Sequence, residues 1–231
     1  MASSEMLVKM AGMALKGQTV LVTGGSGGIG SAISKLFRQA GCNVIITGTN
    51  QEKLDNFVEQ LPEGEGKVFS YAFDISKKEE VDAAIAKTAE DCPPIDILVN
   101  NAGFALAATK PFWEQDFKDV AAVLGVNLHG AALEGFSNVL RQELSGSNIR
   151  LLVNRPGIVE TEFHARRSEY DEKATAAVFE VITPLQAEDI AQSVLWQCLQ
   201  PERISVVLME TLSTSVRSLY EIDREWEKRN Q

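Results

Sequence analysis

Short apolar runs alternate with segments of helical periodicity along most of the chain. Residues 19–22 are apolar on both faces and rich in β-branched side chains, which is typical of a strand buried in a parallel sheet. Apolar residues then recur at helical spacing from Ile29 to Ala40, and Gly41 supplies a helix end. The same alternation predicts further strands at 43–47, 68–73, 95–100, 149–153 and 204–209, and further helices at 51–61, 78–90 and 187–197.

Strands that alternate with helices form right-handed βαβ units around a parallel sheet. The sequence therefore predicts the α/β class, with a Rossmann-like doubly wound parallel sheet. A chain of 231 residues can bury one sizeable core, and neither a repeat nor a linker divides it. We expect a single domain over residues 1–231, with an N-terminal extension at 1–16 and a C-terminal tail at 211–231.

Charge and cysteine content exclude several classes of function. A formal net charge of -10 leaves no basic face for a nucleic acid partner. Cys42, Cys92 and Cys198 lie far apart without a C-x-x-C pair, so we predict no metal site and a reducing compartment. Lys9 and Lys16 interrupt the apolar N-terminal segment. We therefore expect no secretory signal, no membrane span and a cytoplasmic protein, with an organelle presequence as the alternative.

A glycine-rich segment, TGGSGGIG at residues 23–30, lies between the first expected strand and helix. At such a place, backbone N–H groups and the helix dipole hold a pyrophosphate, and glycine lets the backbone approach it. The alternative is a turn that only permits tight packing of strand and helix, but the strand before it and the helix after it favour the phosphate-binding interpretation. The candidate cofactor-binding residues here are Thr23, Gly24, Ser26, Gly28, Ile29 and Gly30.

Four further motifs occur later in the chain: Asp74 in FDIS, the NNAG segment at 100–103, Asn127 in VNLHG, and RPGIVET at 155–161. Together with TGGSGGIG, these motifs resemble the short-chain dehydrogenase/reductase family over about residues 17–210. The resemblance implies an NAD(P)-linked oxidoreductase that interconverts an alcohol and a carbonyl on a small-molecule substrate. The N-terminal half resembles acyl-carrier-protein ketoreductases, whereas residues 136–163 look more like dehydrogenases of hydroxy acids such as serine.

The resemblance also implies roles for single residues. Asp74 would lie by the adenine, Asn101 and Gly103 would line the ribose side of the cleft, and Thr161 would meet the nicotinamide carboxamide. Each residue has a structural alternative, because Asp74 and Thr161 could cap the segments after them and Asn101 could hold a turn. The cofactor-binding set implied by the resemblance is completed by Ile75, Ala102, Pro156 and Gly157.

The end of the second expected strand bears on the choice of cofactor. An acidic residue there would bond the ribose 2′-hydroxyl and select NAD. The chain instead reads Thr47, Gly48, Thr49, Asn50, with Lys53 one turn later. Hydroxyl and amide donors at Thr49 and Asn50 suit a 2′-phosphate, so we predict NADP(H) rather than NAD(H). A solvated helix face is the alternative for Lys53.

The catalytic residues of the family do not recur in this sequence. The family uses a tyrosine with a lysine four residues later, because the lysine lowers the tyrosine pKa, together with a serine and an asparagine. Only the asparagine survives, as Asn127. Residues 131–136 resemble the family segment directly after the catalytic lysine, and Gly130 stands where the lysine would align. The active site therefore looks truncated, with roughly forty residues missing on ordinary element lengths.

This loss would leave the sheet one strand short of the family norm. We expect residues 117–144 to run as one helix, and residues 149–153 to pair beside the strand at 95–100. Tyr170, with Lys173 three residues later, reads as a solvated segment, and His129 and His164 read as local structural residues. The family's usual dimer-interface helices would be cut, so we expect a homo-oligomer to be weakened or altered.

Three functions remain open from the sequence. The first is an NADP(H)-linked oxidoreductase with a substrate-covering loop at residues 163–181. The second is a catalytically inactive nucleotide-binding or interaction protein, favoured by the missing tyrosine and lysine. The third is an incomplete splice product or mis-joined gene model of a longer enzyme, because the junction after Gly130 is clean.

Overall fold

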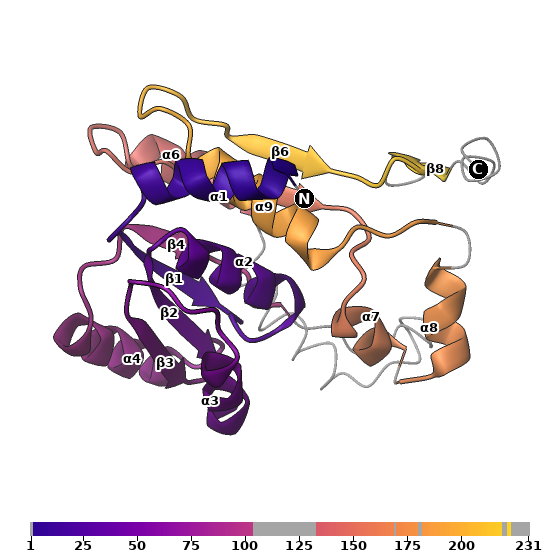
Figure 1. The fold of residues 1–231 in the computed structure, drawn as a ribbon, viewed down its shortest axis with the longest axis horizontal. Coiled ribbons are helices and arrows are strands. Elements are labelled where there is room, and N and C mark those ends of the chain that lie inside the picture. The colour runs from indigo at the N-terminus through magenta and orange to yellow at the C-terminus, as the bar shows by residue number, and fades with distance from the viewer. Residues whose placement is uncertain (1, 104–132, 169, 180–181, 219–220, 223–231) are drawn as a thin grey trace.

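A four-stranded parallel sheet, called sheet A, forms the centre of the N-terminal half (Figure 1). The computed structural model describes residues 2–103, 133–168, 170–179, 182–218 and 221–222. In the described part of the chain the strand order of sheet A is β3-β2-β1-β4. The strands are β1 (Thr19–Thr23), β2 (Asn43–Gly48), β3 (Val68–Ala72) and β4 (Ile97–Val99). This sheet confirms the predicted α/β class and Rossmann-like parallel sheet.

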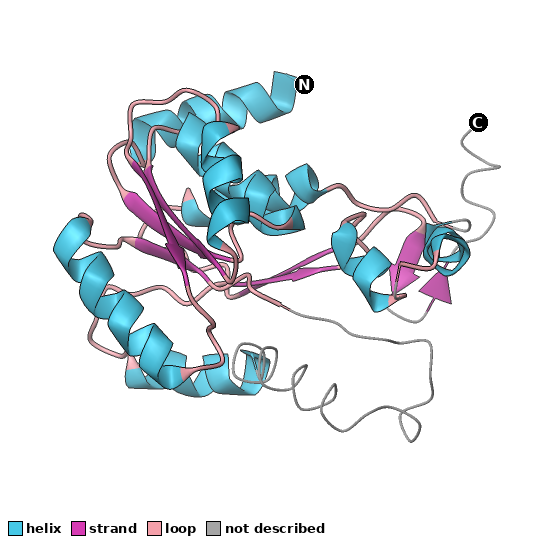
Figure 2. Ribbon diagram, turned by 90° about the horizontal axis from the view of Figure 1, so that it is seen from below, coloured by secondary structure: helices cyan, strands magenta, loops and turns pink. Residues whose placement is uncertain are grey.

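Helices cover both faces of sheet A (Figure 2). One face carries α1 (Ala2–Ala14), α2 (Gly28–Gln39), α3 (Gln51–Glu59) and α9 (Ala187–Cys198), whose apolar side chains share one buried core with β1 and β2. The other face carries α4 (Lys78–Asp91), as expected for right-handed crossovers in this strand order. The two faces are therefore packed by different helices.

The core on the α2 side is well filled. Phe37 of α2 and Leu195 of α9 are fully buried, as are Val20 and Val44, which face each other across β1 and β2. The opposite side is less complete, because Leu98 of β4 is 60% exposed. The sheet is thus firmly packed where it meets α9 and α2, the helix that follows the glycine-rich turn.

The N-terminal segment and the C-terminal half complete the described structure. Helix α1 places Ala11 and the nearby Leu15 in the core. The remaining helices are α6 (Leu133–Glu143), α7 (Glu162–Arg167) and α8 (Glu172–Phe179). The remaining strands are β5 (Val153–Pro156), β6 (Leu208–Thr211), β7 (Val216–Ser218) and β8 (Glu221–Ile222). No helix among the described residues is long and apolar enough to cross a bilayer.

The predicted strand at 149–153 is wrong in its bounds and in its partner. Strand β5 begins at Val153, and it pairs in parallel with β6 in a separate two-stranded sheet, called sheet B, rather than with β4. Side chains of α9 explain this position. Gln197 donates to the Val153 carbonyl and Asn154 donates to Ser193 and Gln197, so β5 runs along α9.

The last expected strand, at 204–209, is observed as β6 at Leu208–Thr211, so it lies further along the chain. Arg150 donates to the carbonyls of Cys198, Gln200 and Ile204, which holds the segment after α9 outside a strand until Leu208. Residues 117–132 of the expected long helix lie outside the described residues, and α6 accounts for 133–143.

Candidate functional site

The glycine-rich turn connects β1 to α2 at the carboxyl end of sheet A. Its backbone is compact, because Gly25 N donates to Thr47 O and Gly27 N donates to Gly24 O. A Cβ on Gly30 would lie 2.2 Å from the Gly24 carbonyl oxygen, so this position requires glycine. The close approach explains why the motif ends on a glycine inside the first turn of the helix.

The first turn of α2 presents free backbone donors. Gly27 is the N-cap and provides no side-chain cap, and the first helical bond runs from Ser31 N to Gly27 O. Within the described part of the chain, the N–H groups of Gly28, Ile29 and Gly30 therefore have no acceptor. Three such donors at the positive end of a helix suit an anion such as a phosphate.

Thr161 lies directly on this turn. A Cβ added to Gly28 would be 2.7 Å from Thr161 Cγ2, so the two residues are in close contact although they come from opposite halves of the chain. Thr161 is the N-cap of α7 without a side-chain cap bond. Gly157 N donates to Thr211 O, which anchors the segment between β5 and α7 to sheet B. Pro156 is the last residue of β5.

Thr23 and Asn101 join the ends of β1 and β4. The backbone N–H groups of Asn101 and Ala102 both donate to Thr23 Oγ1 at 3.0 Å, and Asn101 Nδ2 donates to Thr23 O at 3.0 Å. Asn101 therefore holds a turn, in agreement with its structural alternative. The contacts place residues 101–103 beside the glycine-rich turn, where a ligand on α2 would meet them.

Asp74 also has a local structural role. Its Oδ1 accepts hydrogen bonds from the backbone and the hydroxyl of Ser76 at 2.9 and 2.7 Å. These bonds, with the Lys77 ammonium nearby, lower the pKa of the Asp74 carboxyl. Asp74 thus stays ionised and stabilises the turn into α4, with Ile75 half-buried next to it.

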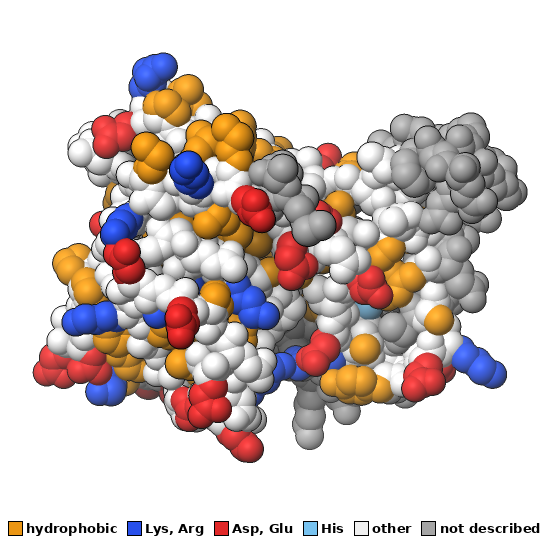
Figure 3. All heavy atoms as spheres, viewed as in Figure 1, with side chains coloured by type: hydrophobic (Ala, Val, Ile, Leu, Met, Phe, Trp, Pro, Cys, Tyr) orange, Lys and Arg blue, Asp and Glu red, His pale blue; other side chains and the backbone are white. Residues whose placement is uncertain are grey.

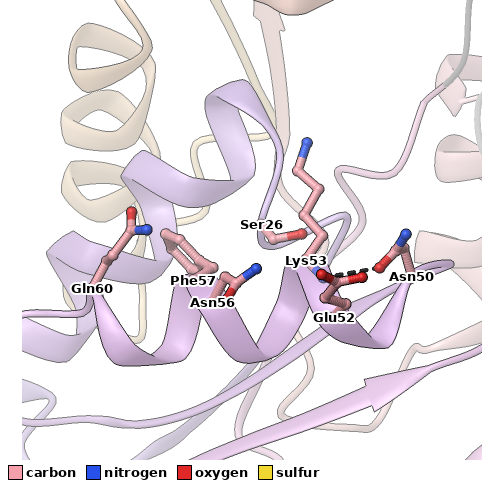
Figure 4. A pocket seen from close by; sticks show the side chains of 7 residues that line it. All are labelled: Ser26, Asn50, Glu52, Lys53, Asn56, Phe57 and Gln60. Carbon is pink, nitrogen blue, oxygen red and sulfur yellow. Dashed lines mark hydrogen bonds between the residues drawn. The ribbon is translucent and has the colours of Figure 1, made fainter.

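A pocket of about 300 Å³ opens beside the turn, along α3 (Figure 4). Asn50 is the N-cap of α3, and its Oδ1 accepts a hydrogen bond from Lys53 N at 2.9 Å. In the described part of the chain, the Asn50 Nδ2 group keeps no partner and remains a donor. The pocket is lined by Ser26, Asn50, Glu52, Lys53, Asn56, Phe57 and Gln60.

Several of these pocket residues were missed from the sequence. Glu52, Asn56, Phe57 and Gln60 were not singled out, although Asn56, Phe57 and Gln60 recur at helical spacing with Lys53 on the expected helix at 51–61, so their periodicity was a usable signal. One lysine lines the pocket, and a second lies near one of its lining residues. Lys35 of α2 lies 5.8 Å from the ring centroid of Phe57, and Lys53 Nζ lies 3.5 Å from Glu162 Oε2 on α7. No sequence signal links Glu162 to this pocket.

Neither of the two described tyrosines, Tyr71 and Tyr170, is well placed to donate a proton to a substrate. Tyr71 contacts the Cys92 sulfur at 3.3 Å and donates to Asp91 at 3.2 Å; burial and these neighbours raise its pKa. Tyr170 is 66% exposed in the turn between α7 and α8, with a backbone φ of 62°. Neither hydroxyl contacts a lysine in the described part of the chain. Asn127, Gly130, His129 and Tyr220 lie outside the described residues.

The helices after Thr161 form a pair held by aromatic contacts. The His164 ring of α7 lies 5.9 Å from Phe163 and 5.4 Å from Phe179 of α8, in edge-on geometry. This packing agrees with a local structural role for His164. No cluster of metal-ligating side chains occurs in the described ranges of the chain. On the face shown in Figure 3, basic side chains are scattered among acidic ones.

Comparison with known proteins gives consistent matches. The model of a family described as short chain dehydrogenase matches residues 18–133. Serine 3-dehydrogenase of Agrobacterium fabrum is 31% identical over 236 aligned residues, covering 84% of this chain and 93% of that protein. Sulfoacetaldehyde reductase 2 of Chromohalobacter salexigens is 27% identical over 250 residues, covering 89% and 98%. A probable NADP-dependent dehydrogenase of Haemophilus influenzae is 30% identical over 244 residues, covering 87% and 95%.

Solved structures share the same fold. The closed form of a serine dehydrogenase complexed with NADP+ matches with a TM-score of 0.75 and 24% identity, covering 84% of this chain and 94% of that one. A dehydrogenase/reductase from Sinorhizobium meliloti matches with a TM-score of 0.74 and 25% identity, covering 88% and 96%. Because 84–88% of the chain is covered, the similarity extends over both halves of the chain.

Proposed function

Because the chain belongs to the short chain dehydrogenase family, we propose that it binds a nicotinamide adenine dinucleotide, with NADP(H) preferred to NAD(H). One observation carries the proposal: in the described part of the chain the N–H groups of Gly28, Ile29 and Gly30, in the first turn of α2, have no acceptor, and Gly28 is exposed to solvent. Backbone donors at the positive end of a helix suit the negative charge of a pyrophosphate.

The remaining cofactor-binding residues are assigned from their places around that turn. The pyrophosphate would lie on Gly28, Ile29 and Gly30, with Ser26 and Asn50 toward the adenosine side and Thr161 on the other side. When bound, the nicotinamide accepts or donates the hydride. We assign the full cofactor-binding set to Thr23, Gly24, Ser26, Gly28, Ile29, Gly30, Thr49, Asn50, Asp74, Ile75, Asn101, Ala102, Gly103, Pro156, Gly157 and Thr161.

The preference for NADP(H) rests on the pocket along α3. Asn50 Nδ2 is a free donor there, and Lys53 brings a positive charge to its lining. A second ammonium, that of Lys35, lies 5.8 Å from the ring centroid of Phe57, which also lines the pocket. Glu52 is an opposing negative charge in the lining. Two relatives support the preference, since one is named as NADP-dependent and another is solved with NADP+.

We further propose that this chain alone binds the cofactor without interconverting an alcohol and a carbonyl. Hydride transfer to or from carbon requires a proton at the substrate oxygen, and a useful acid has a pKa near the working pH. Tyr71 has a raised pKa and lies against Asp91, and Tyr170 is largely exposed to solvent. Gly130 stands at the position that resembles the family's lysine.

The lengths of the alignments support a missing catalytic segment. The alignment with the Agrobacterium enzyme has 236 positions. It includes 84% of the 231 residues of this chain, which is about 194 residues, so about 42 positions of that enzyme lie opposite gaps in this chain. The Haemophilus protein aligns over 244 positions with 87% of the chain, about 201 residues, leaving about 43. The match to the family model ends at residue 133, shortly after Gly130.

A second candidate function is turnover of a hydroxy acid or related alcohol. The observation that favours it is the similarity over nearly the full length of serine 3-dehydrogenase, 93% of that protein. Under this candidate, helices α7 and α8 after Thr161 would cover the substrate, and a proton donor would come from outside the described residues.

A titration of the purified chain separates these candidates. NADPH and NADH are added while nucleotide fluorescence and the melting temperature are recorded, and turnover is assayed with hydroxy acids and ketones. Binding without turnover is the expected result. Turnover would establish the second candidate, and a folded chain that binds neither nucleotide would refute the cofactor proposal.

A further inference from the structure

A long-range ion pair joins the edge of the α3 pocket to helix α7. Lys53 Nζ lies 3.5 Å from Glu162 Oε2, although the two residues are 109 positions apart in the sequence. Lys53 lines the pocket, and Glu162 is the first residue of α7, directly after Thr161. The Lys53 side chain is 44% exposed and that of Glu162 is 68% exposed, so the lysine is free to turn toward a different anion.

Glu162 has a second cationic partner. Arg166 NH2, one helical turn later on α7, lies 3.3 Å from the same Oε2 atom. If Lys53 turned away, the carboxylate would keep this partner and its contact with water. Moving Lys53 from Glu162 to another anion therefore costs little free energy, since an exposed ion pair contributes little to stability.

We propose that Glu162 determines how strongly the chain discriminates 2′-phosphorylated from unphosphorylated dinucleotides, by competing with the 2′-phosphate for the Lys53 ammonium. The inference rests on the proposed function, because it concerns the same cofactor site. A phosphate monoester carries about -1.5 to -2 charge at pH 7 and attracts Lys53 more strongly than one carboxylate does. A ribose 2′-hydroxyl carries no charge and leaves Lys53 with Glu162.

Glu52 is the rival for this role. It lines the pocket itself, and Figure 4 shows its carboxylate below Asn50 while the Lys53 side chain extends in a different direction, past Ser26. Glu52 therefore acts on a bound phosphate only through its own negative charge. Glu162 acts in two ways, by repelling the phosphate and by holding the lysine that would bind it.

The test compares NADPH and NADH binding to four proteins by calorimetry at low ionic strength. Glu162→Gln is expected to bind NADPH about threefold to fivefold more tightly, with NADH unchanged, which is the range for an exposed charge interaction. Glu59→Gln is the matched control, since it removes one negative charge from α3 at a position outside the pocket lining. Glu52→Gln tests the rival.

A lysine variant distinguishes competition from simple repulsion. In a Lys53→Gln background, the gain from Glu162→Gln is expected to shrink to less than half, because there is no ammonium left to release. Adenosine 2′,5′-bisphosphate and AMP repeat the comparison without the nicotinamide half. The gain should also fall as salt is added.

Each other result overturns the inference. It is wrong if Glu162→Gln matches the Glu59→Gln control, if NADH affinity rises equally, or if the gain is undiminished without Lys53. If the wild-type chain binds both nucleotides and Glu162→Gln leaves the ratio of NADPH to NADH affinity unchanged, this inference is refuted and the proposed function still stands. A folded chain that binds neither nucleotide refutes both.

Discussion

The contact between Gly28 and Thr161 makes a sharp prediction about how the two halves of the site depend on each other. Substitution Gly28→Ala adds a Cβ that would lie 2.7 Å from Thr161 Cγ2 and 2.8 Å from Thr161 Cβ. Carbon atoms normally stay at least about 3.4 Å apart, so Thr161 and the start of α7 must move by several tenths of an ångström.

The magnitude is set by two opposing effects. Overpacking of this kind costs about 1–3 kcal/mol. Alanine also reduces the entropy of the unfolded chain relative to glycine, which returns about 0.4–1 kcal/mol. A net loss of about 1–2 kcal/mol corresponds to a melting temperature roughly 2–8 °C lower for a chain of this size.

The assay is a double-mutant cycle read by thermal and urea unfolding. Thr161→Gly removes both atoms that the new Cβ would meet, so Gly28→Ala in that background should be neutral or stabilising by up to about 1 kcal/mol. The difference between the two backgrounds isolates the contact. If Gly28→Ala has the same effect with and without Thr161, the two residues are not in contact and α7 does not meet the glycine-rich turn.

Three other outcomes are expected. Arg150→Met should destabilise the fold by about 1.5–3 kcal/mol in urea unfolding, because the last carbonyl of α9 and two carbonyls in the segment after it lose a charged donor; an unchanged midpoint would show that sheet B is held without Arg150. The lowered pKa of Asp74 stabilises the fold above the ordinary aspartate pKa, and this contribution is lost as pH falls through the lower folded-state value. Asp74→Asn should therefore narrow the stability difference between pH 6 and acid pH, and a pH profile parallel to wild type would contradict this. Burial raises the pKa of Cys42 to about 11, so iodoacetamide at pH 8 should label this thiol only on unfolding; rapid native labelling would argue against its burial.

The elements around the glycine-rich turn were predictable from local pattern. Strands β1 and β2 are apolar on both faces because helices or neighbouring chain cover both sides, and the observed Thr19–Thr23 and Asn43–Gly48 agree with the expected 19–22 and 43–47. Helix α2 ends before Gly41, as its glycine indicated. The catalytic assignment of Asn127 and the roles of the cofactor-binding residues stay predictions.

Other parts of the site were less directly predictable. Asn50 and Asp74 were expected as cofactor contacts, and the structure shows them capping α3 and bracing the turn before α4. Short polar side chains at strand ends serve both purposes, so residue type alone does not separate a cap from a ligand. At Asn50, the side-chain oxygen caps α3, and the Nδ2 group, which has no partner in the described part of the chain, is left to contact a ligand in the pocket.

The sequence by itself determined what depends on neighbours along the chain: the alternation of strand and helix, the glycine-rich turn, and the family to which these motifs belong. The tertiary structure decided what depends on residues brought together from far apart. Strand β5 joins β6 because α9 holds it through Gln197, and Lys53 meets Glu162 from a distance of 109 residues. The physical reason is that hydrophobic periodicity specifies which face of an element is buried, whereas the choice of partner depends on hydrogen bonds and charges that exist only once the chain has folded.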